Sequence, residues 1–192
     1  MKKNIPITAL AVSSLTAMLF TSVVQAADED LRSASQQAIA DFQNKDSTLQ
    51  KLLGDSAGYA VFPNVGKGGF IVGGARGKGL VYEKTNVVGE ATLTQASIGA
   101  QVGGQTFAEM ILFETPAALS DFKAGKFEMS ADVSAVAAAE GASAAAKYKN
   151  GVAVFALPKK GLMVQASVGG QKFKFEPVPM EPTGRPSPTP NN

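Results

Sequence analysis

Apolar and polar residues alternate with a period of two in the middle of the chain. From 92 onward, Ala96, Ile98 and Val102 alternate with glutamine, serine and glycine. Successive side chains of a β-strand point to opposite faces, so this pattern predicts a strand with one apolar face. After Phe107, the run Met110–Phe113 is apolar on both faces, which is typical of a strand in the centre of a sheet.

Part of this pattern occurs twice. Gln95–Phe107 contains Gln-Ala-Ser-Ile-Gly followed by Gly-Gly-Gln-Thr-Phe, and Gln165–Phe173 contains Gln-Ala-Ser-Val-Gly overlapping Gly-Gly-Gln-Lys-Phe. The first copy is four residues longer, and four residues are two repeats of a strand, so the side chains keep their faces. This repeated sequence pattern predicts a sheet built from similar glycine-rich strands.

The remaining strands are expected where short apolar runs lie between turn residues. They span 58–62, 69–82, 152–157 and 162–175, with Pro63-Asn64 and Pro158–Gly161 ending the first and third. Residues 127–146 allow two interpretations. Their alanine content favours a helix, whereas alternation over 127–137 favours a strand, which is the interpretation preferred here.

Two helices are expected. Apolar residues between 28 and 53 recur on one helical face, with a break possible near Lys45. Thr115 and Pro116 suit the N-cap and first position of a short mid-chain helix that Gly125 ends. The fold class predicted is therefore α+β: a curved antiparallel sheet or partly closed barrel with an N-terminal helix and a short mid-chain helix.

The two ends of the chain differ from its middle. Residues 1–26 have a basic start, an apolar run and the small-residue site Val24-Gln25-Ala26, which predicts a signal peptide and an exported, periplasmic or secreted protein. An uncleaved membrane anchor is the alternative. The folded domain is expected at 27–176, and the proline-rich stretch 177–192 is expected to be a disordered tail.

The composition speaks against catalysis. The chain has no histidine and no cysteine, which excludes Ser-His-Asp and Cys-His nucleophiles and the usual zinc sites. Ser120 and Lys123 match a Ser-x-x-Lys motif, but its partner motifs are missing, so a solvated helix face is the simpler interpretation. The carboxylates Glu90, Glu109, Glu114 and Asp132 are scattered. We expect neither an enzyme nor a metal or cofactor site.

Charge points to a local binding surface. Basic residues number 18 and acidic residues 16, and removal of Lys2 and Lys3 with the signal peptide would leave 16 of each. Nucleic-acid binding is not expected from this balance. Candidate lipid-binding residues are Lys67, Phe70, Arg76 and Lys78. Such residues suit an anionic membrane surface, where each cation adds about 1 kcal/mol, and the alternative is protection of a sheet edge by lysine.

Several motifs together resemble one family. Ala57–Pro63, Gly68-Gly69, Gly77-x-Gly79 and Ser97-x-Gly99-x-Gln101-x-Gly103-Gly104, followed by Met110–Phe113, are similar to the SYLF family, also called the Ysc84 actin-binding domain family. The resemblance implies a β-rich α+β domain that binds phospholipid without catalysis. Some eukaryotic members bind actin, which is not expected as a partner of an exported protein.

The function expected is therefore that of an exported phospholipid-binding module that recognises anionic lipid at a membrane surface. The alternative is a structural or protein-interaction module of the cell envelope, with an envelope protein as its partner.

Overall fold

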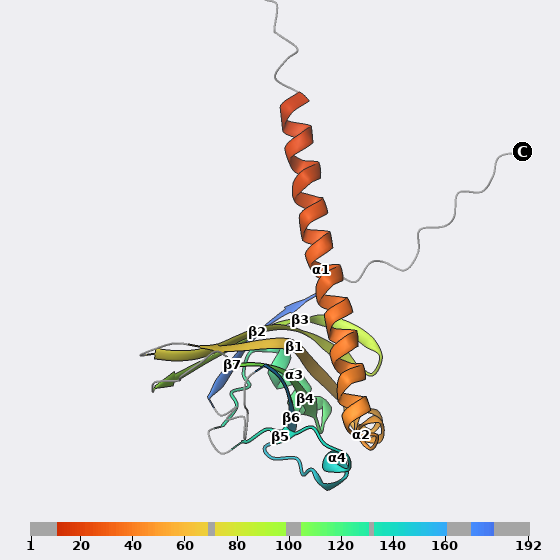
Figure 1. The fold of residues 1–192 in the computed structure, drawn as a ribbon. Helices are drawn as coiled ribbons and strands as arrows, with labels where there is room; N and C mark the ends of the chain where they lie inside the picture. Colours follow the sequence, from red (N-terminus) through yellow and green to blue (C-terminus); the bar gives the residue numbers. More distant parts are fainter. Residues whose placement is uncertain (1–10, 69–71, 99–104, 131–132, 161–169, 179–192) are drawn as a thin grey trace, which may run out of the picture.

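The computed structural model describes residues 11–68, 72–98, 105–130, 133–160 and 170–178, which form an α+β fold (Figure 1). The helices are α1 (Ala11–Lys45), α2 (Leu49–Asp55), α3 (Pro116–Lys123) and α4 (Ala142–Ala145). The strands are β1 (Gly58–Gly68), β2 (Val72–Glu83), β3 (Asn86–Ile98), β4 (Gln105–Phe113), β5 (Val136–Ala137), β6 (Val152–Lys160) and β7 (Gln171–Pro177). Residues 1–10 of the expected signal peptide and 179–192 of the expected tail lie outside the described residues.

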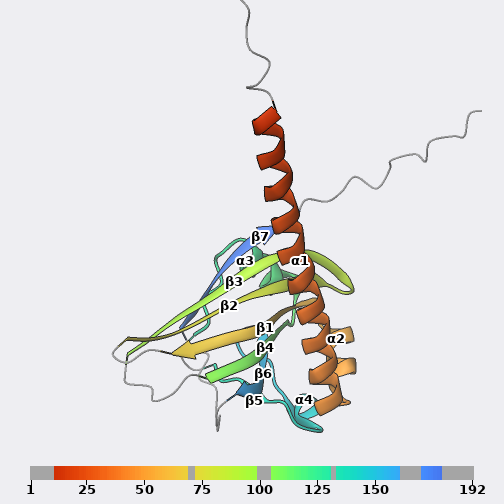
Figure 2. The same cartoon turned by 45° about the horizontal axis from the view of Figure 1, so that its top comes forward.

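The described strands form one sheet in the order β5-β6-β4-β1-β2-β3-β7 (Figure 2). Neighbouring strands are antiparallel except β5 and β6, which run parallel. Because β5 and β7 stand at the two ends of this order, the described sheet is open and mixed rather than a closed barrel. The expected α+β class is confirmed, and β4 lies between two neighbours, as its apolar sequence predicted.

The sheet buries a core on each face. One face packs under α1 and α2, where Phe42 and Leu49 contact residues such as Leu80 and Met110. The other packs against α3 and the segment after it, with Phe122 against a group of phenylalanines. Each strand side chain therefore belongs to an α1 face or an α3 face of the sheet. Within the described residues, no helix combines the length and apolarity of a membrane span.

Two strands run past prolines that were expected to end them. β1 continues beyond Pro63 to Gly68, and β6 continues through Pro158 to Lys160. In both cases the strand register shifts next to the proline. Such an irregularity lets a strand continue where proline cannot donate to the ladder. The turns predicted at these prolines were therefore wrong.

The strand predicted over 127–137 is also wrong in most of its length. Among the residues of this segment that the structure describes, only Val136 and Ala137 form a strand, β5. The alternation of burial is nevertheless real, because Met129 and Val133 point into the core. Met129 exchanges backbone hydrogen bonds with Gly170 and Gln171, so the segment lies along β7 without forming a regular ladder.

The helix ends follow the expected chemistry in part. Thr115 is the N-cap of α3, and its side chain accepts a hydrogen bond from the Ala118 amide at 3.2 Å. The break between α1 and α2 falls at Asp46, next to the expected position. The carboxylate of Asp46 accepts hydrogen bonds from the Thr48 hydroxyl at 2.6 Å and the Ser143 amide at 2.6 Å. Asp46 thereby ties the helix break to α4.

Candidate functional site

Two of the four predicted site residues stand together on β2. Arg76 and Lys78 are both exposed and lie two residues apart, so their side chains leave the same side of the strand. Leu80 continues the same alternation and is buried beneath α1. Arg76 and Lys78 therefore occupy the part of the α1 face that the helix leaves uncovered.

This position argues against edge protection. β2 is flanked by β1 on one side and by β3 on the other. Arg76 is in register with Gly66 of β1 and Thr94 of β3, so it lies inside the sheet. Lysine and arginine protect a sheet from association when they stand on an edge strand. A different role is needed for these two cations.

The register extends the cations into a larger surface. Arg76, Thr94 and Lys172 stand side by side across β2, β3 and β7. The next row on the same face consists of Lys78, Thr92 and Lys174. We name this surface the cationic sheet face; it comprises Arg76, Lys78, Thr92, Thr94, Lys172 and Lys174.

The cations of β7 are accessible. Their side chains are 71% exposed in Lys172 and 76% exposed in Lys174. Each makes one ion pair, Lys172 with Glu128 at 3.2 Å and Lys174 with Glu176 at 2.6 Å. Ion pairs this exposed contribute little to stability and exchange partners readily. They leave both ammonium groups able to bind an anion from solution.

A row of carboxylates borders the face where it meets α1. Glu90 and Glu176 are in register on β3 and β7, and Asp28 of α1 lies near Glu90. Burial raises the pKa of Glu90, the neighbouring charge of Asp28 raises it further, and Lys78 opposes this shift. The hydrogen bond from Lys174 lowers the pKa of Glu176. Cations thus occupy the free end of the face and acids its end beside the helix.

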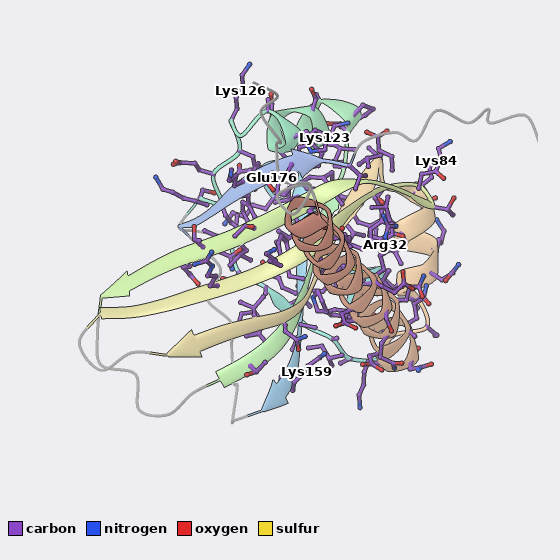
Figure 3. All side chains as sticks on the ribbon, turned by 90° about the horizontal axis from the view of Figure 1, so that it is seen from above. Arg32, Lys84, Lys123, Lys126, Lys159 and Glu176 are labelled. Carbon is purple, nitrogen blue, oxygen red and sulfur yellow. The ribbon has the colours of Figure 1, made fainter. Side chains whose placement is uncertain are left out.

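The fifth cation near this surface comes from β6. Lys159 is exposed, and its Nζ lies 3.4 Å from Oδ1 of Asn64, which is in register with Lys78. Figure 3 shows Lys159 beside β6, on the side of the molecule opposite Lys126 and α3. Lys159 therefore extends the positive charge toward β1.

The other two predicted site residues are Lys67 and Phe70. Lys67 lies in β1, but Gly66 rather than Lys67 is in register with Arg76. Phe70 belongs to residues 69–71, which lie outside the described residues. Lys172 and Lys174 were missed from the sequence, although the alternation Lys-Phe-Lys-Phe at 172–175 could have placed both on one face of a strand.

The carboxylates examined for catalysis are not brought together. Glu109 is fully buried on the α3 face and accepts a hydrogen bond from Gln171 at 2.9 Å, whereas Glu90 stands on the α1 face. Glu114 is exposed at the end of β4, and Asp132 lies outside the described residues. Among the described residues, no group of three acidic side chains could hold a metal ion.

The Ser-x-x-Lys motif lies on α3. Ser120 is exposed, and the ammonium group of Lys123 forms an ion pair with Glu83. This contact joins α3 to the end of β2, so Lys123 has a structural partner.

Part of the chain is similar to known proteins. Residues 94–177 match the family Ysc84, described as Las17-binding protein actin regulator. This stretch includes Thr94, Lys172 and Lys174 of the cationic sheet face. The chain is also 34% identical over 125 residues to beta cell expansion factor A of Aeromonas veronii, an alignment that covers 64% of this chain and 48% of the relative. The chain therefore spans about half the length of that relative. The expected resemblance is confirmed: residues 94–177 of the chain match the Ysc84, or SYLF, family.

Proposed function

We propose that this protein binds anionic phospholipid at a membrane surface through the cationic sheet face. The observation that carries the proposal is the alignment of Arg76 and Lys78 on an interior strand with Lys172 and Lys174 on β7. The match of residues 94–177 to the SYLF family supports the proposal, because the resemblance implies phospholipid binding.

The energetics favour weak, reversible binding. Each lysine or arginine near an anionic bilayer adds about 1 kcal/mol. The ion pairs of Lys172 and Lys174 and the acids beside α1 offset part of this attraction. Binding should therefore depend strongly on salt, because the Debye length falls from about 10 Å at 0.1 M to about 3 Å at 1 M.

The proposed function excludes catalysis, and it includes export to the periplasm or the cell exterior. The missing histidine and cysteine support the first point, and the sequence of residues 1–26 supports the second. The family description names an actin regulator, but the proposal assigns no actin-related role to this chain.

Co-sedimentation with vesicles tests the proposal. The protein should sediment with vesicles containing phosphatidylglycerol or cardiolipin at low salt, and it should remain in solution with phosphatidylcholine alone. The double variant Arg76→Glu/Lys78→Glu removes at least two attractive contributions, or about 2 kcal/mol, so its affinity should fall by about 30-fold or more.

A matched control separates the local surface from net charge. Lys126 and Lys147 are exposed residues outside the cationic sheet face. The double variant Lys126→Glu/Lys147→Glu changes the net charge by the same amount and should retain most of the binding. Equal loss in both double variants would refute the assignment of the surface. No sedimentation of the folded protein with any anionic vesicle would refute lipid binding and favour the envelope-interaction alternative.

A further inference from the structure

We infer that the cationic sheet face prefers a phospholipid head group that carries two phosphates joined by a short hydroxylated linker, as in cardiolipin. This inference rests on the proposed function and goes further, because it names the lipid class. It comes from the arrangement of the cations rather than from their number.

The cations stand in two parallel columns. Arg76 and Lys78 form the first column on β2, and Lys172 and Lys174 form the second on β7. Neighbouring strands are about 4.8 Å apart, so the single strand between them puts the columns about 10 Å apart at the backbone. Within a column, two residues along the strand separate the cations by about 7 Å.

The strand between the columns offers hydroxyl groups instead of charges. Thr94 lies between Arg76 and Lys172, and Thr92 lies between Lys78 and Lys174. Thr94 is exposed, and its hydroxyl donates a hydrogen bond to the Lys172 carbonyl at 3.4 Å, which leaves the hydroxyl oxygen able to accept a further hydrogen bond. A hydroxyl both donates and accepts hydrogen bonds, which suits an uncharged polar linker better than a phosphate.

Each column contains two cations, which are enough to bind one phosphate. The guanidinium of Arg76 can bind phosphate oxygens in a two-pronged manner, with Lys78 as a second cation. Two lysines on β7 can serve the second phosphate once their exposed ion pairs with Glu128 and Glu176 exchange. Long, flexible side chains can lean toward each other, so the two columns can adapt to the spacing of the two phosphates.

Covalent linkage of the phosphates makes the arrangement selective. Once the first phosphate is bound at one column, the linker holds the second near the other column at a high effective concentration. When the two phosphates belong to separate lipids, each must bind its column in an independent event. A two-phosphate lipid should therefore bind more tightly than the same number of phosphates on single-phosphate lipids.

The experiment compares cardiolipin with phosphatidylglycerol in phosphatidylcholine vesicles, matched for total anionic phosphate. The readout is the ratio of the two apparent affinities at one salt concentration. We expect the wild-type protein to favour cardiolipin by about tenfold, a modest part of the avidity available to linked sites. A ratio near one with clear binding to both lipids would overturn the inference and leave the proposed function intact. Absence of binding to both lipids would overturn both.

Variants that neutralise one column at a time provide the second test. Arg76→Gln/Lys78→Gln and Lys172→Gln/Lys174→Gln should each bring the ratio close to one while some binding to phosphatidylglycerol remains. The control Lys126→Gln/Lys147→Gln should keep the ratio of the wild type. If either column variant weakens both lipids equally and keeps the ratio, the two-column arrangement is wrong. Thermal unfolding of each variant checks that the sheet is intact.

Discussion

The carboxylate of Asp46 links the N-terminal helices to the second half of the chain, and its replacement by asparagine should destabilise the fold. Asp46 is 2% exposed, and it accepts hydrogen bonds from the Thr48 hydroxyl and from the amides of Thr48, Gly141 and Ser143. Asparagine has the same shape, but it lacks the charge and presents one donor where the carboxylate presents an acceptor.

The magnitude follows from the pKa of this carboxyl group. Burial raises the pKa, but the hydrogen bonds from Thr48 and Ser143 outweigh burial and lower it from 3.8 to about 2. A shift of this size corresponds to at most about 2 kcal/mol of stability at pH 7. Because the pKa of the folded state is depressed, this contribution is present above about pH 4 and is lost as the pH falls through about 2.

Urea denaturation at pH 7 and at about pH 2.5, toward the acidic end of that window, measures both effects. At pH 7, Asp46→Asn should lower the free energy of unfolding by about 2 kcal/mol. The difference from the wild type should narrow at the lower pH, because the wild-type carboxylate is then partly protonated. Asp121→Asn, on the exposed side of α3, is the matched control and should change stability by less than about 0.5 kcal/mol. The reasoning would be refuted if Asp46→Asn lowered the free energy of unfolding by less than about 0.5 kcal/mol, or by the same amount at both pH values.

Three further expectations concern other parts of the chain. Intact-mass measurement of the protein recovered from its native cell should show that residues 1–26 are missing, and a retained Met1–Ala26 would support the membrane-anchor alternative. Gly79→Ala should cost about 1–3 kcal/mol in a denaturation experiment, because a Cβ atom there would collide with the Val61 carbonyl and the Phe62 ring at the register shift of β1. Thr115→Ala should cost about 1 kcal/mol through loss of the α3 cap, whereas Thr115→Ser should be nearly neutral.

Local features of the structure could be predicted from the sequence. Thr115 and Pro116 begin α3 because capping chemistry acts within one turn of a helix. Arg76 and Lys78 share a face because strand parity acts between residues two apart. The central place of β4 followed from apolar side chains on both faces.

Features that depend on distant partners could not be predicted in the same way. The sequence around Lys172 does not specify that β7 pairs with β3, so the second column of cations became visible only from the strand order. Local rules predict that strands end at Pro63 and Pro158. In the structure, shifts in register beside these prolines let β1 and β6 continue. Residues 127–137 have the alternation of a strand, yet in the described part of this segment Val136 and Ala137 pair with β6 and Glu128 makes an isolated bridge to Lys172 of β7.

The strand order also decides how this family domain can fold. β1 and β2 precede the matched segment 94–177, but they lie in the middle of the sheet, between β4 and β3. A fragment limited to that segment would contain β4 with β6 and the paired part of β3 with β7 as two pieces that share no backbone ladder in the described sheet, although Gln171 of β7 still donates a hydrogen bond to Glu109 of β4. The autonomous folding unit is therefore larger than the stretch by which the family is recognised. Folding of this unit should also be slow, because Thr94 and Lys172 come together across 78 residues of chain and such distant pairings slow folding.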